Sequence, residues 1–198
     1  MENSIAVVLD WDYTLFDTFK MLTALARFFY QNYGIEEKDF WRSYREIRSR
    51  GNYDIQFHLD YFSLVENKNI ACFRKDYSSY LFADTVWFLR KMRTLQIACL
   101  IYSCGVPQFQ MEKIVRSGVK GYFKGFVFCK SPDKTEFLPQ LSKCFETLFF
   151  VDDRLDVLKK INENFPKIRT FWIDREEPNH RERQVFRDLK SIYKEIGG

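Results

Sequence analysis

Histidine and cysteine are sparse in this sequence, and neither forms a recognisable metal-binding or catalytic motif. The chain has two histidines, and its five cysteines include no CxxC pair. An odd cysteine count without such spacing argues against a disulfide framework and against a zinc site. Cys104 has no histidine near it in the sequence, which argues against thiol catalysis. We therefore expect a protein of a reducing cytoplasm.

Long apolar runs and a strong excess of one charge are also absent. No apolar run approaches the length of a membrane-spanning helix, and the first residues show no signal-peptide pattern. Lysine and arginine number 31 against 27 acidic residues, which gives a net charge of +4 at pH 7. That excess is too slight and too evenly spread to indicate nucleic acid. We expect neither a membrane nor a nucleic acid as a partner.

The sequence does contain enough apolar and aromatic side chains for a large core. Of its 198 residues, 46% are hydrophobic and 21 are phenylalanine. This composition argues against a disordered chain. The length fits one sizeable domain, or a domain that carries a large insertion.

Short apolar runs alternate with helical patterns along most of the chain. Apolar runs without polar alternation are typical of strands buried on both faces, and they lie at 5–9, 97–102, 126–129, 148–151 and 168–173. The alternation with helices predicts an α/β fold around a parallel sheet.

Capping and breaking residues locate the helices between these strands. We expect a helix capped by Asp84 and another from Pro107 to Gly118 with Val115 on its apolar face. A third helix should start at Ser131–Pro132 and break at Pro139. Two more are expected around 155–161 and over 180–196, and the last of these should bury Val185.

Residues 16–82 interrupt this alternation. The block contains no convincing buried strand, and its periodicity predicts helices near 18–33 and 36–50, ended by Gly34 and Gly51. Two further helices are predicted over 52–66 and 69–82. We therefore expect a core domain of residues 1–15 and 83–198, with a helical insertion at 16–82.

Two carboxylates directly follow the first predicted strand. Asp10 and Asp12 stand where open α/β sheets place their ligands, at the carboxyl end of a strand. Carboxylates so close repel each other unless a cation or a proton compensates, and Mg²⁺ is the hard cation that suits them. One could act as a nucleophile on phosphorus and the other as acid and base. A surface turn rich in aspartate is the alternative interpretation.

Further polar residues end two other predicted strands. Ser103 ends the second strand along the chain, and Asp152 and Asp153 end the fourth, preceded by Lys130 and Lys134. In a parallel sheet these ends open onto one edge. Phosphoryl transfer needs a nucleophile, a metal held by carboxylates, donors for the phosphoryl oxygens and a cation, and this edge supplies all of them.

The order of these motifs resembles that of the haloacid dehalogenase-like (HAD) hydrolase superfamily. The DxDxT motif after a strand matches residues 10–14, the serine after the next core strand matches Ser103, and the acidic pair matches Asp152 and Asp153. The lysine of that pattern matches Lys134, with Lys130 as the alternative. The resemblance implies a three-layer, Rossmann-like parallel sheet with an inserted helical cap.

The resemblance also implies roles for these residues. Asp10 would be the nucleophile of an aspartyl-phosphate, and Asp12 would protonate the leaving group and then activate water. Mg²⁺ would be held by Asp10, the backbone carbonyl of Asp12, and Asp152, with Asp153 acting through water. Ser103 would donate to a phosphoryl oxygen, and the lysine would neutralise the carboxylates. The implied function is hydrolysis of a small phosphorylated metabolite.

Some residues depart from the pattern or leave alternatives open. Tyr13 stands where many members have glycine, and Trp11 is large for its place between the carboxylates. Dehalogenases of the superfamily lack the second aspartate, so Asp12 favours phosphate chemistry. His58 could touch substrate, although a structural role is favoured, and Asp156 is either a site residue or a helix-terminal acid. A phosphotransferase or mutase, and a non-catalytic HAD-like binding protein, are the alternative functions.

Overall fold

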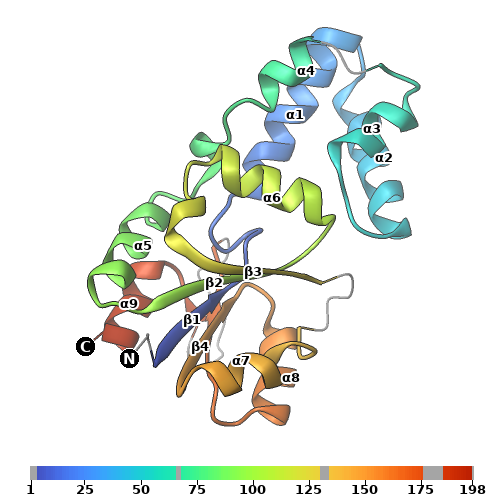
Figure 1. Cartoon of the computed structure of the whole chain (residues 1–198). Helices are drawn as coiled ribbons and strands as arrows, with labels where there is room; N and C mark the ends of the chain where they lie inside the picture. The colour runs from blue at the N-terminus through green and yellow to red at the C-terminus, as the bar shows by residue number, and fades with distance from the viewer. Residues whose placement is uncertain (1–3, 66–67, 130–133, 176–184, 198) are drawn as a thin grey trace.

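A six-stranded parallel sheet lies at the centre of the molecule (Figure 1). The computed structural model describes residues 4–65, 68–129, 134–175 and 185–197. The strand order is β3-β2-β1-β4-β5-β6, and every neighbouring pair is parallel. The strands are β1 (Ile5–Leu9), β2 (Ala98–Cys104), β3 (Phe123–Cys129), β4 (Thr147–Asp152), β5 (Arg169–Ile173) and β6 (Val185–Phe186). The predicted α/β class with a parallel sheet is confirmed.

Helices cover both faces of the sheet, which gives three layers (Figure 1). Alternate residues of β1 point to opposite faces: Val7 and Leu9 belong to one buried apolar cluster, and Ala6 and Val8 to the other. The first face carries α5 (Thr85–Thr94), α6 (Pro107–Arg116) and α9 (Leu189–Gly197), and the second carries α7 (Leu138–Cys144) and α8 (Leu155–Asn164). Burial on both faces explains why the strands read as continuous apolar runs.

Four helices precede α5 and stand together beyond the carboxyl ends of the strands, at the top of Figure 1. We call them the inserted helices: α1 (Thr18–Tyr33), α2 (Glu37–Arg50), α3 (Ile55–Tyr61) and α4 (Lys68–Phe73). Gly34 ends α1 with φ 68°, a left-handed conformation that glycine adopts without strain. The helices predicted at 52–66 and 69–82 are much shorter than expected, with a 3₁₀ turn at Ser78–Tyr80. The division into two domains stays a prediction.

Aromatic packing holds the inserted helices together and gives His58 a structural place. The ring of His58 is fully buried and stacks on Phe40 with ring centres 4.2 Å apart. Its Nδ1 lies 2.7 Å from the Tyr53 hydroxyl. Burial lowers the pKa of His58 to about 4, so the ring is neutral near pH 7 and remains part of the core.

Two helix predictions near the end of the chain are wrong in detail. Pro139 lies in the first turn of α7, where a missing N–H costs nothing, so it starts a helix instead of breaking one; Ser131 and Pro132 lie outside the described residues. The last helix begins at Leu189, whereas Val185 lies in β6 and pairs with Trp172 of β5. A two-residue strand is too short to show a period in sequence.

No helix in the described ranges is both long and apolar enough to cross a bilayer.

The prediction that Val115 lies on the buried face of α6 is wrong, because Val115 is 47% exposed. The buried face of α6 runs instead through Phe109, Gln110, Lys113 and Ile114.

Asp84 does not cap α5 but binds two residues from the last part of the chain, Arg175 and Leu189. Its side chain makes no cap hydrogen bond to α5. Its Oδ2 accepts from Arg175 Nη1 at 2.9 Å and from the backbone N–H of Leu189 at 2.7 Å. Arg175 also donates to the carbonyl of Thr14 at 2.7 Å. The pair therefore ties the loop after β1 to the starts of α5 and α9.

Replacing Asp84 by Ala should destabilise the protein by about 3 kcal/mol, because it leaves a buried guanidinium without its carboxylate. Asp84→Asn should cost less, since the amide oxygen can still accept from Leu189. Urea unfolding of the two variants and the wild type measures both costs. A loss below about 0.5 kcal/mol for Asp84→Ala would show that the pair contributes nothing.

Candidate active site

The carboxyl ends of β1, β2 and β4 meet beneath the inserted helices and form the floor of a pocket of about 420 Å³. In-register pairing places Leu9 beside both Ile101 and Val151. The residues that follow these positions therefore emerge side by side. Asp10, Ser103, Lys134 and Asp153 all line the pocket.

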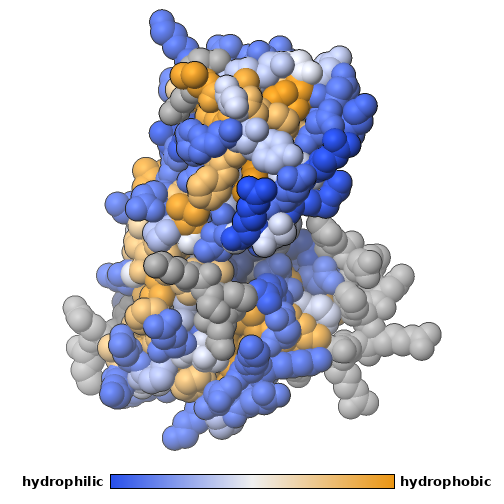
Figure 2. Space-filling view, turned by 90° about the vertical axis from the view of Figure 1, so that its right-hand side faces the viewer, coloured by the Kyte–Doolittle hydropathy of each residue, from blue (hydrophilic) through white to orange (hydrophobic). Residues whose placement is uncertain are grey.

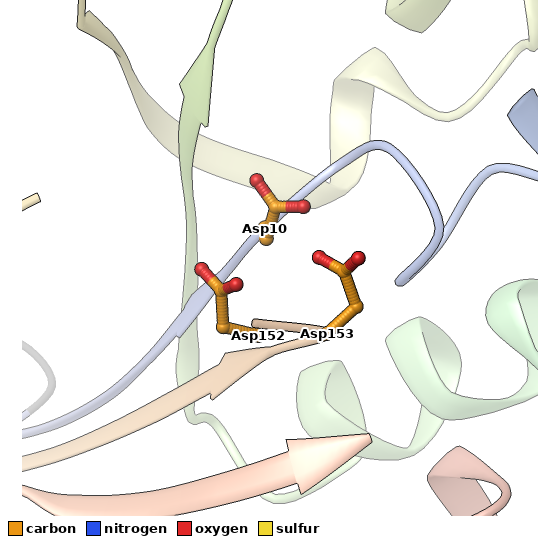
Figure 3. Close-up of side chains that lie close together, drawn as sticks. All are labelled: Asp10, Asp152 and Asp153. Carbon is orange, nitrogen blue, oxygen red and sulfur yellow. The ribbon is translucent and has the colours of Figure 1, made fainter. Parts of the chain in front are cut away.

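Three carboxylates gather at the ends of β1 and β4 (Figure 3). Ligand oxygens of Asp10, Asp152 and Asp153 lie within 4.8 Å of one another. Burial, with the neighbouring Asp152 and Asp12 carboxylates, raises the pKa of Asp10 to about 7, although the Lys134 ammonium opposes the shift. Burial and the charges of Asp10 and Asp152 raise the pKa of Asp153 to about 9. The cluster therefore contains too little positive charge for all three carboxylates to be ionised near pH 7.

Lys134 supplies part of that charge. Its ammonium, 3% exposed, lies 2.5 Å from Asp10 Oδ1 and 2.7 Å from Asp152 Oδ2. Burial opposes its charged form, but the two carboxylates raise its pKa above the usual range. Of the two candidate lysines, Lys134 therefore reaches the cluster, whereas Lys130 lies outside the described residues.

The donor set fits Mg²⁺. Mg²⁺ prefers oxygen ligands and is commonly bound by one or two carboxylates and several waters. Asp10, Asp152 and Asp153 offer only oxygens, and the raised pKa values of Asp10 and Asp153 reflect a shortage of positive charge that a metal ion would supply. The side chain of Asp12 is not part of this cluster and is bonded instead by Gln110 and Lys113 of α6. The role of its backbone carbonyl as a metal ligand, which the family resemblance implies, stays a prediction.

The affinity for Mg²⁺ should rise with pH between about 6 and 9. In the metal-free protein Asp10 and Asp153 keep protons up to about pH 7 and about pH 9, and a metal must displace those protons. Both values lie above those of an unfolded chain, so these groups stabilise the metal-free fold at low pH and lose that contribution as pH rises through 7 and 9.

Thermal unfolding with and without millimolar Mg²⁺ tests this prediction. The increase in Tm caused by Mg²⁺ should be larger at about pH 8.5 than at about pH 6. Asp153→Asn, which removes one of the titrating ligands, should reduce the difference between the two pH values. An increase that is equal or larger at the lower pH would contradict the assignment.

Asp12 is held by three donors from outside the carboxylate cluster. Thr18 Oγ1 donates to its Oδ1 at 2.5 Å, and Gln110 Nε2 donates to its Oδ2 at 2.7 Å. The ammonium of Lys113, 2% exposed, also bonds Oδ1. Burial alone would raise the pKa of Asp12, but Lys113 and the three hydrogen bonds outweigh it and hold the pKa below its usual value. Asp12 is therefore an ionised, fixed carboxylate in this structure.

Sequence reasoning did not identify Thr18, Gln110 or Lys113. A signal for two of them was present, because Gln110 and Lys113 fall on the stripe of α6 that also carries Phe109 and Ile114. A lysine on a buried stripe needs a charged partner. The identity of that partner, about a hundred residues earlier, could not be read from the helix.

Ser103 and Gly105 shape the end of β2. The Ser103 side chain is 1% exposed, and no described residue hydrogen-bonds its hydroxyl, which lines the pocket. A buried hydroxyl normally has a partner, so this one is available to a ligand.

A Cβ on Gly105 would lie 2.4 Å from Nε2 of Gln110. Glycine is therefore needed there for Gln110 to reach Asp12.

The remaining residues of interest lie beside the reacting groups. Trp11 is fully buried and stacks on Phe16 with ring centres 5.5 Å apart, so it packs beneath the inserted helices. Tyr13 takes φ 62° and lines the pocket together with Tyr44 of α2. Asp156 is 64% exposed in its side chain and pairs with Arg154 at 2.5 Å, outside the carboxylate cluster. Its place agrees with the interpretation as a helix-terminal acid.

Comparison with solved structures identifies the fold. A proposed haloacid dehalogenase-like hydrolase from Burkholderia xenovorans matches with a TM-score of 0.73 and 19% identity over 98% of this chain and 96% of its own. A HAD phosphatase from Thermococcus onnurineus matches at 0.67 and 19%, over 98% of each chain. A proposed β-phosphoglucomutase from Thermotoga maritima matches at 0.66 and 16%, over 99% of this chain and 100% of its own.

L-2-haloacid dehalogenases also match. No protein-family model and no curated protein matches the sequence. These likenesses show that the chain has the three-layer fold of the HAD-like hydrolases, as its motifs predicted.

Proposed function

From this fold and this site, we propose that the chain is a Mg²⁺-dependent hydrolase of phosphate monoesters that acts through an aspartyl-phosphate on Asp10. The observation that carries the proposal is the separation of two carboxylates of different character. Asp10 belongs to the metal-type cluster, whereas Asp12 faces the same pocket but is fixed by Lys113, Gln110 and Thr18.

In the first step an Asp10 carboxylate oxygen attacks phosphorus, and the bond between phosphorus and the leaving oxygen breaks. The leaving alkoxide needs a proton, and Asp12 is the acid placed to deliver it. Because Asp12 is ionised in this structure, that proton must arrive with the substrate. A phosphate monoester, whose second pKa is about 6, brings one in its monoanionic form.

In the second step Asp12 acts as the base. It takes a proton from water, the oxygen of that water attacks phosphorus, and the bond to Asp10 breaks, which restores the Asp10 carboxylate. Asp12 then passes its proton to the departing phosphate, which leaves as the monoanion, so that Asp12 is ionised again for the next substrate. The depressed pKa of Asp12 fits the start of this cycle, and its fixed position fits a group that must serve both steps.

Three groups would stabilise the negative charge of the phosphoryl group during its transfer. The Ser103 hydroxyl is free to donate to a phosphoryl oxygen, and Lys134 contributes positive charge beside Asp10. Mg²⁺ bound by Asp10, Asp152 and Asp153 would supply the remaining positive charge at the phosphoryl oxygens. Fixed donors of this kind stabilise developing charge without reorganisation.

Asp12 also favours phosphate esters over organic halides. A halide leaves as a stable anion and needs no proton, so only the base role of Asp12 would be used in that reaction, in the hydrolysis of the ester. A phosphate monoester would use both the acid role and the base role. The inserted helices stand over the pocket and are placed to exclude water and limit the substrate to a small phosphorylated molecule. We propose that they act as the cap of this enzyme.

The test is release of inorganic phosphate from an aryl phosphate and a panel of metabolite phosphates, with and without Mg²⁺. Release of halide from 2-haloacids is measured in parallel. Metal-dependent phosphate release supports the proposal, and halide release alone would overturn it. Transfer of the phosphoryl group to a second hydroxyl would identify a phosphotransferase or mutase. Mg²⁺ binding with no turnover of any substrate would identify a binding protein.

A further inference from the structure

The wall of the pocket opposite the carboxylates is built by α2 and the loop after it. Tyr44, Arg48, Gly51, Asn52 and Tyr53 line the pocket from that side. In Figure 2 the surface is hollowed between the inserted helices above and the sheet below, and strongly hydrophilic side chains border the hollow from above. The leaving group of a substrate that places its phosphate on Asp10 extends into the rest of this pocket, and this wall is one side of it.

Arg48 differs from the other cations that line this pocket. Lys134 pairs with Asp10 and Asp152, Lys113 pairs with Asp12, and Arg154 pairs with Asp156. Arg48 donates one bond, from Nη1 to the carbonyl of Gly51 at 3.2 Å. Within the described ranges it has no carboxylate at ion-pair distance.

A guanidinium has five N–H donors in a planar fork, so most of those of Arg48 remain for a ligand. Such a fork matches the two oxygens of a carboxylate or a phosphate. Tyr44, which carries a hydroxyl group, lines the same wall. The chemistry of this wall therefore suits an anion better than an uncharged sugar or an apolar group.

We propose that Arg48 selects the substrate by binding a second anionic group, a carboxylate or a second phosphate, on the leaving group of the phosphate monoester. This inference rests on the proposed function and specifies its substrate class. The pocket volume of about 420 Å³ must hold both the phosphate and the leaving group. The leaving group is therefore that of a small molecule which carries the anion.

Three substrates of one skeleton test the proposal. Glycerol 3-phosphate has no second anion, 3-phosphoglycerate adds a carboxylate, and glycerol 1,3-bisphosphate adds a phosphate. The wild type should favour one of the anionic substrates at least about tenfold in kcat/KM. The preferred member of the two identifies which anion the site takes.

Arg48→Gln should lower kcat/KM for the preferred substrate at least about tenfold, mainly through KM, and should change the value for glycerol 3-phosphate much less. Arg48→Lys should retain part of the preference. Arg45→Gln is the matched control, because Arg45 lies on the same helix, is exposed and does not line the pocket. Equal losses on all three substrates, or no preference in the wild type, would overturn the proposal.

Binding keeps this test separate from the proposed function. Calorimetry with Asp10→Asn and with Asp10→Asn/Arg48→Gln, in the presence of Mg²⁺, measures the affinity for 3-phosphoglycerate and for glycerol 1,3-bisphosphate without turnover. If the wild type hydrolyses neither compound but the affinity still depends on Arg48, the phosphatase proposal is refuted and the anion site is kept. If the wild type hydrolyses them but the affinity does not depend on Arg48, the anion site is refuted and the phosphatase proposal is kept.

Discussion

Asp10→Asn should abolish phosphate release and lower kcat by at least about 10⁴-fold, the size of loss seen when a covalent nucleophile is removed. An amide cannot attack phosphorus as a carboxylate does. The change also removes one charge from the crowded cluster with Asp152 and Asp153, so the fold should not suffer. Steady-state kinetics and thermal unfolding of the purified variant measure the two effects separately.

Isotopic labelling gives the same prediction a second, independent readout. With excess substrate in H₂¹⁸O, the label should appear in the released phosphate, because water attacks phosphorus and the bond to Asp10 breaks. A carbon ester of Asp10, as organohalide cleavage would form, is hydrolysed at its carbonyl and would place the label in Asp10. Peptide mass spectrometry therefore distinguishes the two reactions. Residual activity of Asp10→Asn near the wild-type value would exclude Asp10 as the nucleophile.

Lys113→Met should lower kcat by about 10²-fold or more while KM changes little, the range expected for impaired acid–base catalysis. Methionine can fill the apolar surroundings of the lysine stem, but it cannot hold Oδ1 of Asp12. The acid and base would lose both its charge partner and its fixed position. Steady-state kinetics as a function of pH measures the effect, and the pH profile should shift because Lys113 lowers the pKa of Asp12.

Stability supplies the control for Lys113. Removing one partner of a buried pair costs about 3 kcal/mol or more, because the other charge is left alone. Asp12→Asn combined with Lys113→Met should recover stability, since neither charge remains, while activity stays lost. Lys91→Met, on the neighbouring helix α5, is a matched change at an exposed lysine. Full activity in Lys113→Met would show that the pair is structural only.

Local sequence patterns predicted the central strands of the sheet and the first two inserted helices. Apolar runs located β1, β2 and β4 because strands buried on both faces exclude polar residues, and chain order placed Asp10, Ser103 and Asp152 at one edge of the sheet. The same patterns gave α1 and α2, whose apolar period is regular and whose ends are marked by glycine. They failed at α9, β6 and the role of Asp84, where tertiary contacts override weak local preference.

The sequence by itself therefore determined five of the six strands and which polar residues end them, because each follows from residues that are close together in the chain. The tertiary structure decided the partners of the reacting groups. Gln110 and Lys113 reach Asp12 across 98 and 101 positions, and Arg48 lies over the pocket because of how α2 packs. Such contacts depend on how whole helices pack against one another, and periodicity along a single segment contains no information about that packing.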